Sequence, residues 1–250
     1  MKEESGMVIK DYSKEILKAT EYSGNNKKNQ KEISASMLGS DLQQALLRYK
    51  YGVIEEDKVT QASIGSLVHL GLSEVYFGVN VHKEIKYSMP YKNWEITGTI
   101  DRIDMANSMI TDIKVSKTYT VKSILEDPMH QYRLQLNAYR MLAENVYDKE
   151  FNMQLEFYDK QGGFNYRTGS EIPHLQYIPI DKIDNEILYE KIDEIIDFVE
   201  LGQEKQCDDI WLRKVGSRTI PTRCELYCSY KQICSKYNPK PQTTIQGWGL

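Results

Sequence analysis

The stretch that decides the fold, residues 98–139, reads GTIDRIDMANSMITDIKVSKTYTVKSILEDPMHQYRLQLNAY. Polar and apolar residues alternate over 94–101, and the run 109–114 is also strand-like, with a connection short enough for a hairpin. Asp101 ends the first of these strands and Asp112 lies on the second. The pattern therefore predicts two neighbouring strands that bring two carboxylates together.

The D-x-K triplet on the second strand has the residue types that metal-assisted phosphodiester hydrolysis uses. Because side chains alternate along a strand, Asp112 and Lys114 share one face while Ile113 points into a core. Carboxylates are hard oxygen ligands for Mg²⁺ or Mn²⁺, and a lysine supplies a positive charge beside the reacting phosphate. The alternative is an exposed hairpin whose charged side chains are only solvated.

Two helical patterns flank these strands. The upstream pattern, over 61–76, has Gly65 where close packing is possible, and His69 one helical turn later. The downstream helix, over 129–146, places Gln135 and Tyr139 four residues apart and so on one face. His69 is a candidate metal ligand, and the alternative is a histidine that only packs within its helix.

The order G-x-x-x-H, G-x-x-D, D-x-K, Q-x-x-x-Y over residues 34–237 resembles the RecB-like exonuclease branch of the PD-(D/E)XK nuclease superfamily, of phage or CRISPR-adaptation type. The resemblance implies a Mg²⁺- or Mn²⁺-dependent deoxyribonuclease that acts on single strands or duplex ends in recombination or end processing. A structure-selective endonuclease and a non-catalytic DNA-binding or metal-cluster scaffold are the alternatives. The implied metal ligands are His69, Asp101, Asp112 and the carbonyl of Ile113, with Lys114 as the catalytic lysine and Gln135 and Tyr139 lining the site.

The remaining histidines and one glutamate have no such setting. His82, His130 and His174 are expected at the surface or behind the site. Glu84 is expected as a charge on an exposed strand edge, where it could at most help to position a ligand.

All four cysteines lie near the end of the chain, at Cys207, Cys224, Cys228 and Cys234. In a reducing compartment, clustered cysteines indicate a metal site more often than disulfides. Some RecB-like nucleases hold a [4Fe-4S] cluster with three late cysteines and one upstream cysteine. The region 33–53 resembles the helix that would carry the upstream cysteine but has none, so Cys207 would supply the fourth ligand. An iron–sulfur cluster, Zn²⁺ and unligated thiols all remain open.

The fold class expected is α/β (α+β), with a central mixed β-sheet flanked by helices in a restriction-endonuclease-like core and a small C-terminal cysteine-rich metal module. The domain boundaries expected are a flexible arm (1–32), the nuclease core (33–205), the cysteine-ligated module (206–237) and a tail (238–250). Further helices are expected near 35–50 and 181–201, a helical stretch broken at Pro128, and strands near 81–88, 151–158 and 174–179.

Composition is ordinary for a globular protein, and the net charge of −4 argues against strong nonspecific binding of nucleic acid. A local basic channel would suffice for an enzyme. Its candidate phosphate contacts are Lys114, Lys117, Lys122, Arg133, Arg140, Arg213, Lys214, Arg218 and Arg223. The sequence has no P-loop motif, signal peptide or membrane-spanning run, so we expect a cytoplasmic protein of a bacterial or phage-infected cell. DNA is the expected partner, together with a recombination or replication protein.

Overall fold

The computed structural model describes residues 30–52, 80–159, 174–205, 207, 224, 228 and 230–237. It also describes the backbone of 163–165, 170–172, 212–215 and 218–221. The arm up to residue 29, the expected helix over 61–76 with Gly65 and His69, and the tail from 238 lie outside the described residues.

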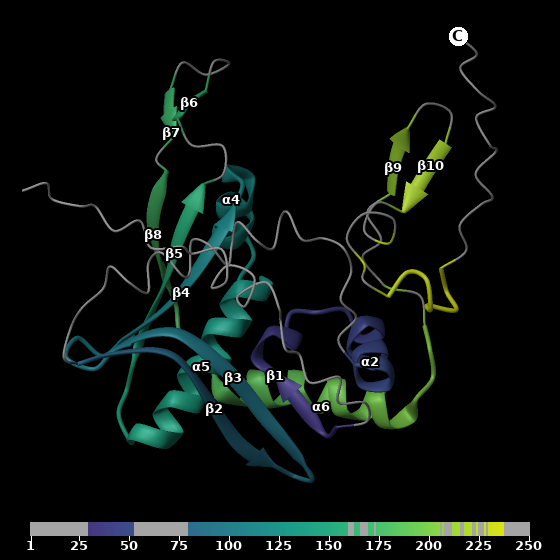
Figure 1. The fold of residues 1–250 in the computed structure, drawn as a ribbon, viewed down its shortest axis with the longest axis horizontal. Helices are drawn as coiled ribbons and strands as arrows, with labels where there is room; N and C mark the ends of the chain where they lie inside the picture. Colours follow the sequence, from purple (N-terminus) through teal and green to yellow (C-terminus); the bar gives the residue numbers. More distant parts are fainter. Residues whose placement is uncertain are drawn as a thin grey trace, which may run out of the picture.

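A six-stranded mixed sheet forms the centre of the molecule (Figure 1). Hydrogen-bonded neighbours follow the order β1-β3-β4-β5-β8. β1 and β4 share one edge of β3, and β2 pairs with the opposite edge. The β1–β3 and β4–β5 pairs are parallel, whereas β2–β3, β3–β4 and β5–β8 are antiparallel. The expected mixed sheet is therefore confirmed. Its strands are β1 (Glu32–Ser34), β2 (Val81–Tyr91), β3 (Trp94–Asp104), β4 (Met109–Ser116), β5 (Asn152–Asp159) and β8 (Leu175–Ile180).

Two short hairpins lie outside this sheet. One consists of β6 (Gly163–Asn165) and β7 (Ser170–Ile172), and the other of β9 (Leu212–Val215) and β10 (Arg218–Pro221). Neither hairpin was expected from the sequence, and neither was β1.

The strand β3 is longer than the neighbours on one of its edges, and this difference opens a fork. β2 pairs along one whole edge, while the other edge is shared by β1, which pairs with residues 95–97, and β4, which pairs with residues 102–104. Residues 98–101 lie between the two ladders. On this edge, the backbone at the end of the G-x-x-D motif is therefore paired with neither β1 nor β4.

Four α-helices and a short 3₁₀ helix are described around the sheet. They are η1 (Ala35–Met37), α2 (Leu42–Tyr51), α4 (Thr118–Glu126), α5 (Gln131–Tyr147) and α6 (Asn185–Leu201). The helix expected over 35–50 is in fact two segments. A Cβ at Gly39 would come within 2.3 Å of the Gln131 backbone, so the chain passes close to α5 there. The Asp41 side chain then caps α2 by accepting a hydrogen bond from the Gln43 amide.

The helix α5 packs against one face of the sheet, and both are held together by a continuous apolar core (Figure 1). The core residues Leu155 and Phe157 of β5 are fully buried, and they pair in register with Asp112 and Lys114 of β4. Directly paired residues share a face, so the D-x-K side chains lie on the side that α5 covers.

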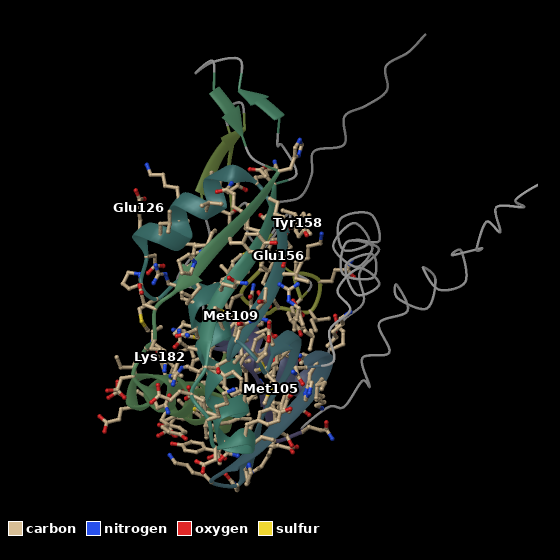
Figure 2. The ribbon with its side chains drawn as sticks, turned by 90° about the vertical axis from the view of Figure 1, so that its left-hand side faces the viewer. Met105, Met109, Glu126, Glu156, Tyr158 and Lys182 are labelled. Atoms are coloured by element: carbon tan, nitrogen blue, oxygen red, sulfur yellow. The ribbon has the colours of Figure 1, made fainter. Side chains whose placement is uncertain are left out.

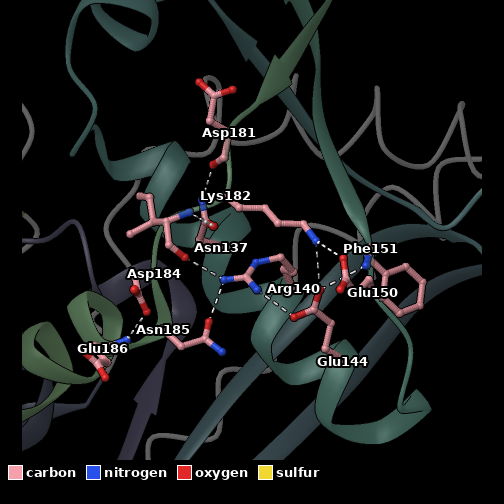
Figure 3. Close-up of polar contacts among 11 residues, drawn as sticks. Asn137, Arg140, Glu144, Glu150, Phe151, Asp181, Lys182, Asp184, Asn185 and Glu186 are labelled. Carbon is pink, nitrogen blue, oxygen red and sulfur yellow. Dashed lines mark hydrogen bonds and ion pairs between the residues drawn. The ribbon is translucent and has the colours of Figure 1, made fainter.

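Polar side chains of α5 anchor the connection between β8 and α6 (Figure 3). Asn137 accepts a hydrogen bond from the Ile183 amide and donates one to the Asp181 carbonyl. Arg140 donates to the Ile183 carbonyl at 2.9 Å and to Asn185 at 2.7 Å. Arg140 is therefore buried in a structural network, and its proposed use as a phosphate contact is wrong. Within the described part of the chain, no helix is long and apolar enough to cross a membrane.

Candidate active site

The carboxylate of Asp101 lies in the fork between β3 and β4. The last ladder pair of these strands is Arg102–Thr111, and the next step of that register places Asp101 opposite Asp112. Instead of a backbone ladder, the Asp101 Oδ2 accepts a hydrogen bond of 2.7 Å from the Ile113 amide. The first carboxylate is therefore held against the backbone of the D-x-K triplet.

Asp112 and Lys114 form a close ion pair beside this contact. The Lys114 Nζ donates a 2.9 Å hydrogen bond to Asp112 Oδ1 and lies 2.7 Å from Oδ2. Burial lowers the pKa of Lys114, but the charges of Asp112 and Asp101 outweigh it, so the pKa is raised above its ordinary value. The lysine is consequently a stable cation next to two carboxylates.

The donor set fits a divalent cation. Asp112 is 1% exposed, and among the described residues its Oδ2 accepts no hydrogen bond, although the ammonium lies close to it. The Lys114 ammonium supplies a counter-charge to this buried carboxylate, and a second cation could share its oxygen atoms. Asp101 and Asp112 supply the hard oxygen atoms that Mg²⁺ and Mn²⁺ prefer. Within the described residues, no group of three or more His, Cys, Asp or Glu side chains is arranged as a metal site, and His69 is not among those residues.

Gln135 and Tyr139 share one face of α5, as their spacing predicts, and Tyr139 lies within electrostatic reach of these carboxylates. The Gln135 Nε2 donates a hydrogen bond of 2.6 Å to the Tyr139 hydroxyl. Burial raises the pKa of Tyr139, and the charge of Asp112 and then that of Asp101 raise it further. Tyr139 therefore stays a neutral phenol within electrostatic reach of both carboxylates.

Gly98 has a physical reason to be glycine. A Cβ there would lie 2.8 Å from two ring carbons of Tyr139 and 3.0 Å from Leu142. The ring can pack on β3 only because this position has no side chain. The G-x-x-D and Q-x-x-x-Y motifs are thus in direct contact.

Glu84 lies closer to the site than its sequence setting indicated. The pairs Lys83–Arg102 and Ile85–Ile100 place Glu84 opposite Asp101, so Glu84, Asp101 and Asp112 follow one another across β2, β3 and β4. The charge of Glu84 also contributes to the raised pKa of Tyr139. The side chain is solvent-exposed, and its charge acts on the Tyr139 hydroxyl in the same direction as those of the two aspartates.

A defect in the pleat of β2 accounts for this placement. His82 and Tyr87 both make hydrogen bonds with the Tyr147 hydroxyl of α5, at 3.0 and 2.9 Å. Residues five apart on a regular strand point to opposite faces, so the pleat changes phase between them. Glu84 lies between them with a φ of 50°, in the left-handed region. Irregularities of this kind occur next to active sites, where they redirect a side chain.

Tyr132 is a further residue of the site that sequence reasoning missed. The Lys114 Nζ lies 5.2 Å from the centroid of the Tyr132 ring, which is within the range of a cation–π interaction. Tyr132 comes one helical turn before Gln135, so a search of the same helical face would have found it.

The opposite face of the same strands carries a buried ion pair. Arg102 of β3 donates a 2.6 Å hydrogen bond to Glu156 of β5, and the Tyr158 hydroxyl donates to the other Glu156 oxygen at 2.7 Å. Glu156 pairs with Ile113, so this contact spans β4 behind the D-x-K triplet. Figure 2 shows Glu156 and Tyr158 on one side of the sheet and Glu126, at the end of α4, on the other.

Other residues named from the sequence have structural roles. Arg133 is buried and donates to the Ile124 carbonyl at 2.7 Å, so it does not face a phosphate. His130 caps α5 by accepting a hydrogen bond from the Tyr132 amide. His174 is exposed, as expected. Lys117 and Lys122 are also exposed, and both remain candidates for phosphate contacts.

The cysteines lie around the start of α2. Burial raises the pKa of Cys207 to about 12, and Asp41, Cys224 and Cys228 contribute to this shift. The Cys234 sulfur is 3.8 Å from Gln43 Nε2 and accepts a hydrogen bond from it. The thiols are unbridged, and no ligand group of three or more is formed among the described residues. The four cysteines thus lie near α2, but the described residues do not place three or more of them as the ligands of one metal.

Comparison with known proteins assigns the family. Residues 77–235, more than half of the 250-residue chain, match the PD-(D/E)XK nuclease superfamily. The chain therefore belongs to this superfamily, as the motif order indicated. No curated protein matches the chain by sequence.

Solved structures agree on the fold. The crystal structure of SSO0001 superposes with a TM-score of 0.62 and 17% identity, covering 89% of this chain and 95% of that one. A phage-related exonuclease from Haemophilus somnus 129PT has a TM-score of 0.45 and 18% identity, covering 68% and 92%. An alkaline exonuclease from Laribacter hongkongensis has a TM-score of 0.36 and 12% identity, covering 70% and 89%. The first likeness establishes the fold, and the other two are too distant to bear on function.

Proposed function

We propose that this protein is a Mg²⁺- or Mn²⁺-dependent deoxyribonuclease that hydrolyses phosphodiester bonds. The observation that supports this most directly is the β3–β4 fork, where Asp101 is bonded to the Ile113 amide beside the Asp112–Lys114 ion pair, in a chain of a nuclease superfamily. Asp101, Asp112, His69 and the carbonyl of Ile113 would hold the metal. When bound, a divalent cation polarises a phosphoryl oxygen and lowers the pKa of a coordinated water.

The protein side chains have separate tasks in this proposal. Asp112 holds the ammonium of Lys114 at the fork. The positive charge of this ammonium stabilises the negative charge that develops on the phosphate. The Tyr132 ring limits where that ammonium can move. Gln135 and Tyr139 form a neutral hydrogen-bonding pair that orients the substrate strand or Lys114.

An exonuclease acting on DNA ends in recombination or end processing is the use we propose, in the cytoplasm of a bacterial or phage-infected cell. A recombination or replication protein is the proposed partner. A structure-selective endonuclease is the alternative. The same site would cut within a strand if the DNA could pass through the site without a free end.

The test compares linear single-stranded, linear duplex and covalently closed circular DNA with Mg²⁺, Mn²⁺ or EDTA. We expect metal-dependent degradation of linear DNA and an intact circle. Cleavage of the circle would support the endonuclease, and equal inactivity of wild type and Asp112→Asn on every substrate would contradict both. In that case a DNA-binding scaffold would be the remaining function.

We further propose that Cys207, Cys224, Cys228 and Cys234 bind one structural metal centre, either a [4Fe-4S] cluster or Zn²⁺. Their common location at α2 supports this, because a bound metal would tie the C-terminal segment to the core. Iron and zinc analysis of anaerobically purified protein, with an absorbance spectrum near 400 nm, distinguishes the two. Protein with neither metal would show that the thiols are unligated.

A further inference from the structure

The helix α4 exposes an aromatic ring directly after the catalytic strand. β4 ends at Ser116, α4 begins at Thr118, and the Tyr119 side chain is 69% exposed. Leu125 in the same helix and Met129 just after it are exposed too. Tyr119 is the most exposed of the three, and it lies only three positions after the end of β4.

Tyr132 connects this surface to the active site. Burial raises the pKa of Tyr132, the charge of Lys114 opposes that shift, and the charges of Asp112 and Tyr119 add to it. The Tyr132 hydroxyl is thus within electrostatic reach of the D-x-K triplet and of the exposed ring. Tyr119 follows Lys114 by five positions, so the chain allows at most about 17 Å between their Cα atoms. A strand with about 3.4 Å between nucleotides would span that distance in roughly five nucleotides.

The helix is fixed in place, so the backbone that carries the ring is held in position. Ile124 is fully buried, and its carbonyl accepts the hydrogen bond from Arg133 of α5. At the other end, the Ser116 and Thr120 hydroxyls are 3.0 Å apart and share a hydrogen bond. A base that stacks on Tyr119 would therefore meet a pre-positioned surface, which lowers the entropic cost of binding.

Local charge also favours nucleic acid here. Lys117 and Lys122, on either side of Tyr119, are exposed in a chain whose net charge is −4, and Lys122 lies 3.6 Å from Glu126 in an exposed ion pair that a phosphate would have to compete with. Aromatic rings that alternate with basic residues are the usual surface for single strands, because every base has a face to stack and every nucleotide has a phosphate. Bases inside a duplex are already stacked, so they do not offer a free face to such a ring.

We infer that Tyr119, flanked by Lys117 and Lys122, is a stacking site for an unpaired nucleotide within about five positions of the scissile phosphate. This inference rests on the proposed nuclease function and names its substrate as an unpaired DNA end. The site prefers single-stranded tails over blunt duplex ends, because a tail presents several unpaired bases to Tyr119 whereas a blunt end presents only the outer face of its last base pair.

The experiment measures binding without metal, so that no cleavage occurs. Duplexes with a 3′ or a 5′ single-stranded tail, and a blunt duplex, carry 2-aminopurine at successive tail or end positions. The variants are Tyr119→Ala and Tyr119→Phe. The control is Tyr177→Ala, which removes a tyrosine of similar exposure (52%) from β8, on the face with Glu156.

With wild-type protein, stacking on Tyr119 is expected to quench the fluorescence of 2-aminopurine at one of the first roughly five tail nucleotides. Tyr119→Ala should bind the tailed duplex about 5- to 150-fold more weakly, the equivalent of about 1–3 kcal/mol, with blunt-end binding unchanged. Tyr119→Phe and Tyr177→Ala should behave as wild type.

The proposal of a stacking site would be wrong if Tyr119→Ala bound tailed DNA as tightly as wild type. It would also be wrong if the variant lost equal affinity for tailed and blunt ends at an unchanged melting temperature. The nuclease proposal would stand if wild type still cleaves with Mg²⁺. Conversely, a tail preference that depends on Tyr119 in a protein that cleaves no DNA would support the stacking site and contradict the nuclease.

Discussion

The Ile113 amide donates a hydrogen bond of 2.7 Å to the Asp101 carboxylate, so one candidate ligand is held by the backbone of the strand that carries the other. This contact places Asp101 and Asp112 opposite each other without a ladder pair between them. The geometry of the two carboxylates therefore depends on the fork and survives only while β3 and β4 stay joined at Arg102–Thr111.

Asp101→Asn should separate the structural and chemical roles of this carboxylate. The amide oxygen can still accept the Ile113 hydrogen bond, so we expect a melting temperature within a few degrees of wild type. Cleavage should fall by at least about 100-fold, since the charge that holds the cation is gone. Initial rates over a range of Mg²⁺ concentrations, with melting curves, measure both. A variant with wild-type rates at every Mg²⁺ concentration would exclude Asp101 from the metal site.

Lys114→Met should lose at least about 100-fold in rate and also lower stability, because it leaves the buried Asp112 without its counter-charge. Mg²⁺ should then raise the melting temperature of the variant more than that of wild type, as the cation replaces the missing ammonium. Melting curves with and without Mg²⁺ test this. Equal Mg²⁺ effects in the two proteins would show that the metal does not contact Asp112.

The pH dependence of the same pair has a definite sign. The pKa of Lys114 is raised in the folded protein, so its contribution to stability is complete below the ordinary lysine value of 10.5. The contribution is lost as the pH rises through the folded pKa. The stability difference between wild type and Lys114→Met, measured by chemical denaturation, should thus be constant between neutral pH and about pH 10 and decline above it.

Glu156→Gln tests the ion pair behind the D-x-K triplet. Glu156 is fully buried and Arg102 is nearly so, and breaking a buried pair leaves an uncompensated charge at a cost of about 3–5 kcal/mol. The matched control is Glu194→Gln, which breaks the exposed pair with Lys191 on α6 and should cost less than about 1 kcal/mol. Chemical denaturation of both variants gives the two values. Similar losses would mean that burial does not distinguish these pairs.

Much of the site was predictable because its chemistry is local in sequence. The period of two over 94–101 and 109–114 and the four-residue spacing of Gln135 and Tyr139 depend only on regular strands and helices. The structure has both strands and the Gln135–Tyr139 hydrogen bond. The break at Pro128 was predictable for the same reason, since proline and the residue before it disfavour a continuing helix.

The features that sequence reasoning missed depend on contacts between distant elements. The helix over 35–50 is interrupted because Gly39 packs on Gln131, which no local pattern reveals. Arg133 and Arg140 look like surface charges in a linear reading, but α5 turns them toward the carbonyl groups of neighbouring segments. Glu84 is exposed on the edge strand β2, as expected, but its place opposite Asp101 depends on the β2–β3 register and on its own left-handed backbone, which alternation alone does not predict.

Glu84→Gln should weaken the site without unfolding it. The side chain is exposed, so the melting temperature should change little, whereas the field on the Tyr139 hydroxyl and on any cation near Asp101 loses one negative charge. We expect the Mg²⁺ concentration for half-maximal cleavage to rise by about 3- to 10-fold, in line with the 10- to 100-fold typical of residues that support metal ligands more closely. Glu95→Gln, an exposed glutamate of β3 away from the fork, is the control and should leave it unchanged. If the two variants show the same Mg²⁺ dependence, the left-handed conformation at Glu84 serves only the pairing of His82 and Tyr87 with α5.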